Sequence, residues 1–259
     1  MAAPSGTAVA RRGTRRKRGE RPARVGDPAR LAAGVVAAVC AAGIATLVFV
    51  DVEPIPSVEV AGARHVTADA ARQLTGLAGI PLFRASATEA RTALLATAAI
   101  RDARVDLGLP TSARITLTER EAGGRWIVGP LEWFVDADGV LFASSDPTAA
   151  PALRVLDDRS PSRFAGERID PALVAAALRL AKIAPGELRP DATAPRVRIG
   201  PGPSGIVLET GGGWEVRFGE PQGIEEKLTL LMRFLRDEPG RRLEYVDVRS
   251  TDRIVFSPE

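Results

Sequence analysis

Apolar residues are distributed very unevenly along this chain. Residues 31–50 read LAAGVVAAVCAAGIATLVFV and contain no charged side chain. A helix of twenty residues rises about 30 Å, which matches the hydrocarbon core of a bilayer. The pattern therefore predicts a transmembrane helix at 31–50, with a short polar segment before it and a long segment of mixed polarity after it.

The charges around this helix predict its orientation. Residues 1–30 carry a net charge of +7 against +3 for the whole chain, which leaves −4 for the rest. Basic flanks stay in the cytoplasm, so we expect a single-pass protein of the plasma (inner) membrane with its C-terminal part outside the cytoplasm. The tail 1–30 is too poor in apolar residues to fold, and we expect it to be disordered and close to anionic lipid. Docking of a cytoplasmic partner is the alternative role for it.

The apolar stretch has three other interpretations: a cleaved signal peptide, a lipoprotein and a buried core helix. A buried core helix does not suit twenty uncharged residues beside an Arg-rich block. A cleaved signal peptide, which the Ala-rich composition leaves open, would have a shorter apolar region of about 7–15 residues. A lipoprotein would need a small residue before its cysteine, whereas Val39 precedes Cys40, the only cysteine. A retained anchor fits better, and Gly34, Ala38 and Ala42 at four-residue spacing predict a face of small side chains on which another transmembrane helix packs.

The segment that follows the anchor predicts a small α+β domain at 54–121. Its expected elements are a strand at 57–62, two helices capped by Thr67 and Ser86, and strands at 100–107 and 113–120. The helix after Thr67 is expected to end near Gly76, and Glu89 three residues after Ser86 completes a capping box. The order strand, helix, helix, strand, strand is sufficient for a two-layer domain.

Residues 122–256 predict a second domain of mixed β-structure with two helices, and 257–259 a short tail. Its expected strands lie at 126–128, 131–135, 140–142, 196–199, 205–209, 214–218, 243–249 and 252–256, and its helices at 171–183 and 224–235. Asp136 to Gly139 lies between two apolar strands and is typical of a hairpin turn. A calcium loop would also need a third ligand and a glutamate at its twelfth position, which are missing here.

The sequence contains no recognisable catalytic, metal or cofactor site. Its single histidine, His65, falls in a predicted turn, where a surface position is expected, and no partner acid or nucleophile can be assigned to it. The glycines at 211–213 open a strand and not a helix, so they lack the context of a phosphate loop. The part after the anchor is slightly acidic and has no basic stripe, which argues against nucleic acid. We expect a protein that acts by contact, without a small-molecule substrate.

Several segments resemble successive motifs of one family. They are Val58 to Gly62 (VEVAG), Gly76 to Gly79 (GLAG), Ala99 to Val105 (AIRDARV) and Ile115 to Arg120 (ITLTER). In this order they are similar to the POTRA domain of the FtsQ/DivIB bacterial cell-division proteins, and the resemblance continues to Phe256. Ala63 and Ala122 depart from the asparagine and proline that are common in the family. The resemblance implies a POTRA domain followed by an FtsQ-type β-domain.

The resemblance also implies a function. It points to a non-enzymatic scaffold at the division septum that links early and late divisome proteins and helps to control septal peptidoglycan synthesis. The implied partners are FtsB and FtsL-type membrane proteins, with the POTRA domain serving recruitment. A POTRA-containing chaperone of envelope protein assembly and an anchored cell-wall enzyme are the alternatives. The first would usually have repeated POTRA units, and the second a nucleophile with its base.

The C-terminal strand is the expected contact surface. A last strand is often the edge of a sheet, where unpaired backbone groups accept a strand from another protein. The predicted partner-binding residues are Tyr245, Arg249, Arg253, Ile254, Val255 and Phe256. The alternative is that Tyr245 and Phe256 only close the core, since half of the residues in a strand face inward. In the family that this chain resembles, the end of the β-domain receives FtsB.

Overall fold

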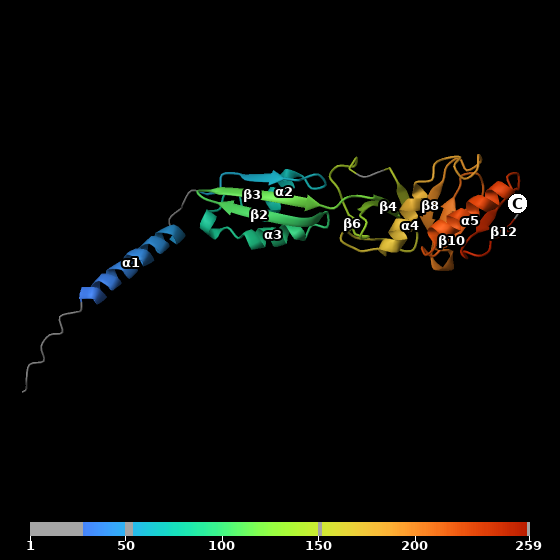
Figure 1. Cartoon of the computed structure of the whole chain (residues 1–259). Helices are drawn as coiled ribbons and strands as arrows, with labels where there is room; N and C mark the ends of the chain where they lie inside the picture. The colour runs from blue at the N-terminus through green and yellow to red at the C-terminus, as the bar shows by residue number, and fades with distance from the viewer. Residues whose placement is uncertain (1–27, 50–53, 150–151, 258–259) are drawn as a thin grey trace, which may run out of the picture. The chain divides into compact units, whose positions relative to one another are not determined.

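The computed structural model describes residues 28–49, 54–149 and 152–257 (Figure 1). Its first helix, α1 (Pro28–Phe49), covers the predicted anchor and begins at Pro28, three residues earlier than expected. The stretch Ala29–Thr46 has a mean hydropathy of 1.8, which suits a membrane span, and its side chains are exposed. Most of the predicted tail 1–30 and the residues that leave the anchor, 50–53, lie outside the described part.

Helix α1 and the remaining chain form separate compact units, and the second unit begins with a three-stranded sheet. Its elements are β1 (Val58–Ala61), α2 (Ala68–Thr75), η1 (Leu82–Arg84), α3 (Ala87–Leu95), β2 (Ile100–Gly108) and β3 (Ser112–Glu119). The strand order is β1-β3-β2, with β1 parallel and β2 antiparallel to β3. The two α-helices pack over the sheet and bury Leu77, Leu94 and Ile115. The predicted strand–helix–helix–strand–strand order is confirmed.

Local sequence accounts for the ends of these helices. The Thr67 hydroxyl accepts the amide N–H of Ala70 at 3.1 Å, and the Ser86 hydroxyl accepts that of Glu89 at 3.2 Å. Both contacts satisfy amides that have no partner within the helix. Gly76 ends α2 with a φ of +59°, a conformation that favours glycine.

A nine-stranded sheet forms most of the second half of the chain. Its elements are β4 (Gly124–Val128), β5 (Leu131–Val135), β6 (Leu141–Phe142), β7 (Arg154–Asp157), α4 (Pro171–Ala181), β8 (Arg196–Ile199), η2 (Gly202–Ser204), β9 (Ile206–Glu209), β10 (Glu215–Gly219), α5 (Ile224–Asp237), β11 (Tyr245–Asp247) and β12 (Val255–Ser257). The strand order is β12-β11-β10-β9-β8-β7-β4-β5-β6. Leu180 of α4 and Leu231 of α5 belong to one buried cluster with Trp126, Val197 and Phe218 of the strands, so both helices cover the same face. The opposite face carries charged side chains.

The structure differs from the sequence analysis in three strands of this sheet. Strand β7 was not predicted, and the last two strands are shorter than expected. Ile254, expected within the final strand, precedes β12, whereas Ser257, expected in the tail, is its last residue. The register of the last two strands places Val246 opposite Phe256, so that both point toward the helices.

The expectation that His65 lies at the surface is wrong. The residue is only 3% exposed. Its Nδ1 lies 3.0 Å from the Ser144 hydroxyl, and its ring meets those of Phe142 and Phe134 edge-on, with centroids 5.0 and 5.9 Å away. The side chains of β5 and β6 thus cover a turn of the first sheet, a contact that no local pattern predicts.

Backbone and ion-pair contacts reinforce this joint between the two sheets. The Glu119 carboxylate accepts the amide N–H groups of three consecutive residues, 64 to 66. The neighbouring Arg120 donates to the buried carboxylate of Asp136 at 2.7 Å and to the carbonyl of Ala98 at 2.8 Å. Phe134 and Phe142, although they lie on strands of the large sheet, belong to the buried cluster of the first sheet. Asp136 also turns the predicted hairpin, in which Gly139 has a φ of +79°.

Candidate partner-binding surface

Strand β12 forms an open edge of the large sheet. It pairs with β11 through Asp247↔Val255, Val246↔Phe256 and Tyr245↔Ser257. In the described chain no strand lies against its other side. Such an edge presents backbone N–H and C=O groups that a strand from another molecule can satisfy.

The far edge of the same sheet is closed. Strand β6 is only two residues long, and the segment that precedes α4 lies against it. The amide of Leu141 donates to the carbonyl of Glu167 at 2.9 Å, and the amide of Gly166 donates to the carbonyl of Leu141 at 2.7 Å. These bonds occupy the groups that an added strand would need at β6.

The two edges of the first sheet are partly blocked by arginines from its helices. Arg72 of α2 donates through Nε to the carbonyl of Val58 on β1 at 2.9 Å. Arg91 of α3 donates through Nε to the carbonyl of Ala103 on β2, also at 2.9 Å. Each contact fills an acceptor that strand addition would require. The edge at β12 is therefore the candidate for strand addition.

The apolar residues predicted for this site lie on both faces of the sheet. Phe256 and Ile254 lie on the helix side, half-buried, and the Phe256 ring is 5.1 Å from that of Phe234 on α5. Tyr245 lies on the other face, where the guanidinium carbon of Arg217 is 4.1 Å from its ring centroid. Val255 shares that face and is 48% exposed. Phe256 thus helps to close the core, while Val255 is free to contact a partner.

The two predicted arginines flank the edge without joining it. Arg249 follows β11 and pairs with Asp247 at 2.6 Å. Burial raises the pKa of Asp247, but its hydrogen bonds and ion pair with Arg249 outweigh this effect, and the pKa lies below its ordinary value. Arg253 is exposed in the loop before β12, next to Asp252. Arg249 is therefore held in place, whereas Arg253 is exposed to solvent.

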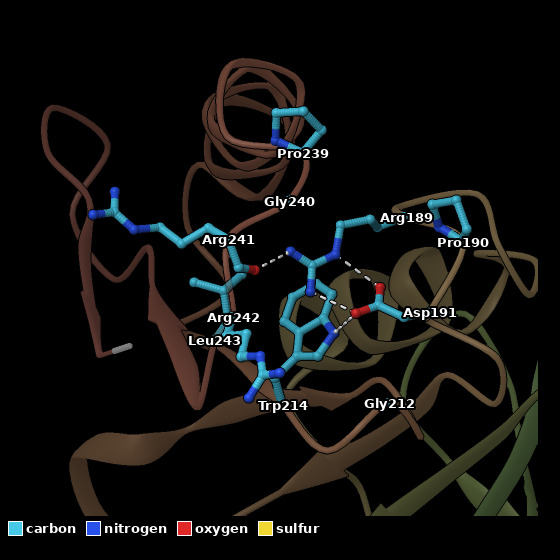
Figure 2. A pocket seen from close by; sticks show the side chains of 10 residues that line it. All are labelled: Arg189, Pro190, Asp191, Gly212, Trp214, Pro239, Gly240, Arg241, Arg242 and Leu243. Atoms are coloured by element: carbon cyan, nitrogen blue, oxygen red, sulfur yellow. Dashed lines mark hydrogen bonds and ion pairs between the residues drawn. The ribbon is translucent and has the colours of Figure 1, made fainter. Parts of the chain in front are cut away.

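A basic pocket beside this edge was not predicted (Figure 2). At its centre the guanidinium carbon of Arg189 lies 4.8 Å from the ring centroid of Trp214. The Nε and Nη2 atoms of Arg189 donate to the carboxylate of Asp191, at 2.8 and 2.5 Å. A third bond, of 2.9 Å, runs from Nη1 to the carbonyl of Arg241. The bond from Arg189, followed by the one from the Trp214 indole, lowers the pKa of Asp191, although burial opposes the shift. Arg189 is thereby fixed in the wall of a cavity of about 320 Å³, with its charge paired by Asp191.

The pocket connects to β12 through the segment between α5 and β11. The guanidinium carbon of Arg241 lies 4.5 Å from the ring centroid of Phe256. Arg242 lies on the same rim and is exposed. Guanidinium groups beside aromatic rings suit carboxylates and aromatic side chains of a protein ligand. Arg189 and Arg241 are 52 positions apart, so no local pattern indicates that they meet. The pair Arg241–Arg242 before a predicted strand is the one sequence feature that points to this pocket.

The described residues outside this surface offer little chemistry. Among them no three His, Cys, Asp or Glu side chains lie close enough to hold a metal ion. The hydroxyl of Ser144, beside His65, donates to the carbonyl of Asp146 at 2.9 Å and lies within the joint between the sheets. Gly34, Ala38 and Ala42 lie on exposed α1, and their packing against another helix stays a prediction.

Comparison with known proteins identifies both halves of the second unit. Residues 53–120 match the POTRA domain, FtsQ-type, and residues 124–249 match the cell division protein FtsQ/DivIB, C-terminal domain. A cell division protein FtsQ from Chloroflexus aurantiacus is 27% identical over 221 residues, which cover 85% of this chain and 79% of that protein. FtsQ from Chloroflexus aggregans is 28% identical over 225 residues, with the same coverage. The chain belongs to the FtsQ/DivIB family of non-enzymatic cell-division proteins.

Proposed function

We propose that this protein is a bitopic scaffold of the division machinery that links early and late divisome proteins and helps to control septal peptidoglycan synthesis. Helix α1 spans the plasma membrane with the basic tail in the cytoplasm, where it meets anionic lipid. The POTRA domain and the β-domain lie outside the cytoplasm, at the septum. The partners are FtsB and FtsL-type membrane proteins. The observation that carries this proposal is the open edge of β12 beside a basic pocket.

The edge and the pocket supply different parts of such an interaction. A partner strand added at β12 gains backbone hydrogen bonds, which provide affinity with little dependence on sequence. Selectivity then comes from side chains that alternate between the two faces. On one face Val255 meets the incoming strand, and on the other Phe256 and Arg241 do so. The arginines favour a partner with acidic residues next to its strand.

A chaperone of envelope protein assembly is a less suitable function for this chain. Such a protein holds many client strands and usually has repeated POTRA units. Here one POTRA match is followed directly by an FtsQ/DivIB C-terminal match. A dedicated partner at one edge fits this organisation better.

The substitution Val255→Lys tests the partner edge. A lysine at an edge strand opposes the addition of another strand, and Val255 is exposed enough for the change to leave the core intact. Leu131→Lys is the matched control, because Leu131 is 43% exposed on β5, away from the edge. We expect Val255→Lys to weaken co-purification of FtsB and FtsL-type proteins at least tenfold, and Leu131→Lys to leave it unchanged.

Equal retention of the partners by both variants would contradict the edge assignment. Thermal unfolding of each variant separates a lost contact from a lost fold. Septal recruitment needs its own experiment, a fluorescent protein fused to Met1 in growing cells. A band at the constriction supports the scaffold, and uniform membrane labelling throughout division would favour the chaperone.

A further inference from the structure

Three segments of the POTRA domain meet at the end where the chain enters it. Strand β1 runs parallel to β3, with Val58 opposite Ala113, so the turn between β2 and β3 lies beside the start of β1. Pro54 forms a bridge with Pro81, and the amide of Ile55 donates to the carbonyl of residue 80 at 3.0 Å. The turn at 109–111 and the short helix η1 therefore share the entry end of the domain.

This end exposes two large apolar side chains. Leu109, at the tip of the β2–β3 hairpin, is 89% exposed, the highest value among the large hydrophobic residues that the structure describes. Phe83 of η1 is 40% exposed, and the guanidinium carbon of Arg84 lies 5.7 Å from its ring centroid. A single exposed leucine needs no explanation by itself. Here the exposed leucine lies at the end of the domain that the chain enters from the anchor, and this position suggests a role.

Two carboxylates on the strands next to this tip are paired with arginines. Asp106 pairs with Arg104 at 2.9 Å, and Glu59 pairs with Arg114 at 2.9 Å. An apolar tip with compensated acids and an arginine beside an aromatic ring suits the boundary between lipid headgroups and acyl chains. Apolar side chains enter that boundary, and cationic groups remain near the headgroups.

The connection between α1 and this end of the domain is short. Only residues 50–53 separate Phe49, the end of α1, from Pro54. The Cα atoms of Phe49 and Pro54 are five residue steps apart and so lie at most about 18 Å from each other. We propose that the POTRA domain contacts the lipid surface through its entry end, with Leu109 and Phe83 inserted at the headgroup boundary. This inference rests on the proposed membrane anchorage of α1.

Fluorescence of the full-length chain in lipid nanodiscs tests this contact. Cys40→Ala removes the native thiol, and Leu109→Cys then carries an environment-sensitive fluorophore at the tip. Ala96→Cys is the matched control, because Ala96 is exposed at the opposite end of β2, about 27 Å away along that nine-residue strand. In discs with anionic lipids and doxyl-labelled acyl chains, we expect blue-shifted emission and several-fold stronger quenching at position 109 than at 96.

Two results would overturn the inference, and they are distinguishable. If the chain fails to co-purify with the discs, the anchorage proposed for α1 is wrong and the lipid contact falls with it. If the chain is retained but position 109 is quenched no more than position 96, the anchor stands and the tip does not enter the lipid. A further variant, Phe83→Ser, should reduce the quenching at position 109 if both side chains insert together.

Discussion

Replacement of Phe142 by alanine tests whether the two sheets share one core. Phe142 belongs to β6 of the β-domain, yet it is fully buried against the POTRA domain. Its ring centroid lies 5.0 Å from that of His65 and 5.9 Å from that of Phe134, in edge-to-face geometry. Phe142→Ala removes both contacts and leaves a cavity at the joint.

The size of the effect follows from burial. Phe→Ala in a core lowers the free energy of unfolding by about 3–5 kcal/mol. Edge-to-face pairs contribute about 0.5–1.5 kcal/mol each beyond buried area, and here two are lost. A loss of about 4 kcal/mol raises the population of opened molecules roughly 700-fold, since about 1.4 kcal/mol is a factor of ten. Domains are commonly stable by about 5–15 kcal/mol, so the variant should still fold.

Hydrogen–deuterium exchange read by mass spectrometry locates the effect. We expect Phe142→Ala to accelerate exchange in β1 and β3 of the POTRA domain as well as in β5 and β6. Phe218→Ala is the matched control, because Phe218 is equally buried but belongs to the cluster beneath α4 and α5. It should accelerate exchange in β9 to β11 and leave β1 unchanged, since local openings follow cooperative units.

Unchanged protection of β1 and β3 in Phe142→Ala would refute the shared core. The POTRA domain would then be stable without the side chains of β5 and β6, and the contacts around His65 would contribute little. If the alanine variant does not fold, Phe142→Leu applies the same reasoning with a smaller cavity.

Three further predictions concern stability. Burial opposes ionisation of Asp157, but hydrogen bonds from Arg159 and Trp126 outweigh this effect and hold the pKa of Asp157 below its ordinary value. The ionised carboxylate therefore stabilises the folded state above about pH 4, and this stabilisation is lost as the pH falls through the folded-state pKa. Asp157→Asn should therefore lower the free energy of unfolding in denaturant by about 3 kcal/mol at pH 7 and by less in acid, and an equal loss at both pH values would contradict this. Gly62→Ala places a Cβ 2.2 Å from the carbonyl oxygen of Leu117, at a residue whose φ is +83°. Gly79→Ala is the control, because Gly79 has a similar φ but open space around it. Calorimetry should show a clearly larger fall in Tm for Gly62→Ala than for Gly79→Ala. The ammonium group of Lys227 donates to the carbonyls of Phe218 and Glu220 at 3.0 and 2.7 Å. Lys227→Met removes this donor and should lower the free energy of unfolding, measured in denaturant, by about 1–3 kcal/mol. An unchanged free energy of unfolding would mean that water replaces the ammonium group.

Elements that depend on nearby residues were predictable from the sequence. The caps at Thr67 and Ser86 are contacts over three residues, and the structure contains both. The hairpin at Asp136 to Gly139 is also local. Helix α5 has an apolar stripe with the period of a helix, and the structure places it on the core as expected. Such patterns are sufficient because the interacting groups lie within a few positions of each other.

The features that were missed depend on distant parts of the chain. His65 is buried by residues nearly eighty positions later, and no pattern around it indicates this. Arg189 and Trp214 form one wall of the basic pocket only after the strands between them have paired. The faces of β12 depend on register, since a shift of one residue would exchange the environments of Val255 and Phe256.

The difference between the two edges of the large sheet limits what this protein can assemble. Propagation of a sheet from molecule to molecule needs two compatible edges, one to give and one to receive. Among the described strands of this sheet, the edge at β6 is occupied by the chain's own backbone, whereas the edge at β12 is open. If a partner strand adds at β12 as proposed, addition to this sheet stops after one step, with one added strand per molecule. A homodimer paired through β12 and a complex with a partner strand are then mutually exclusive, so the concentration of partner sets how much of the protein is free to self-associate.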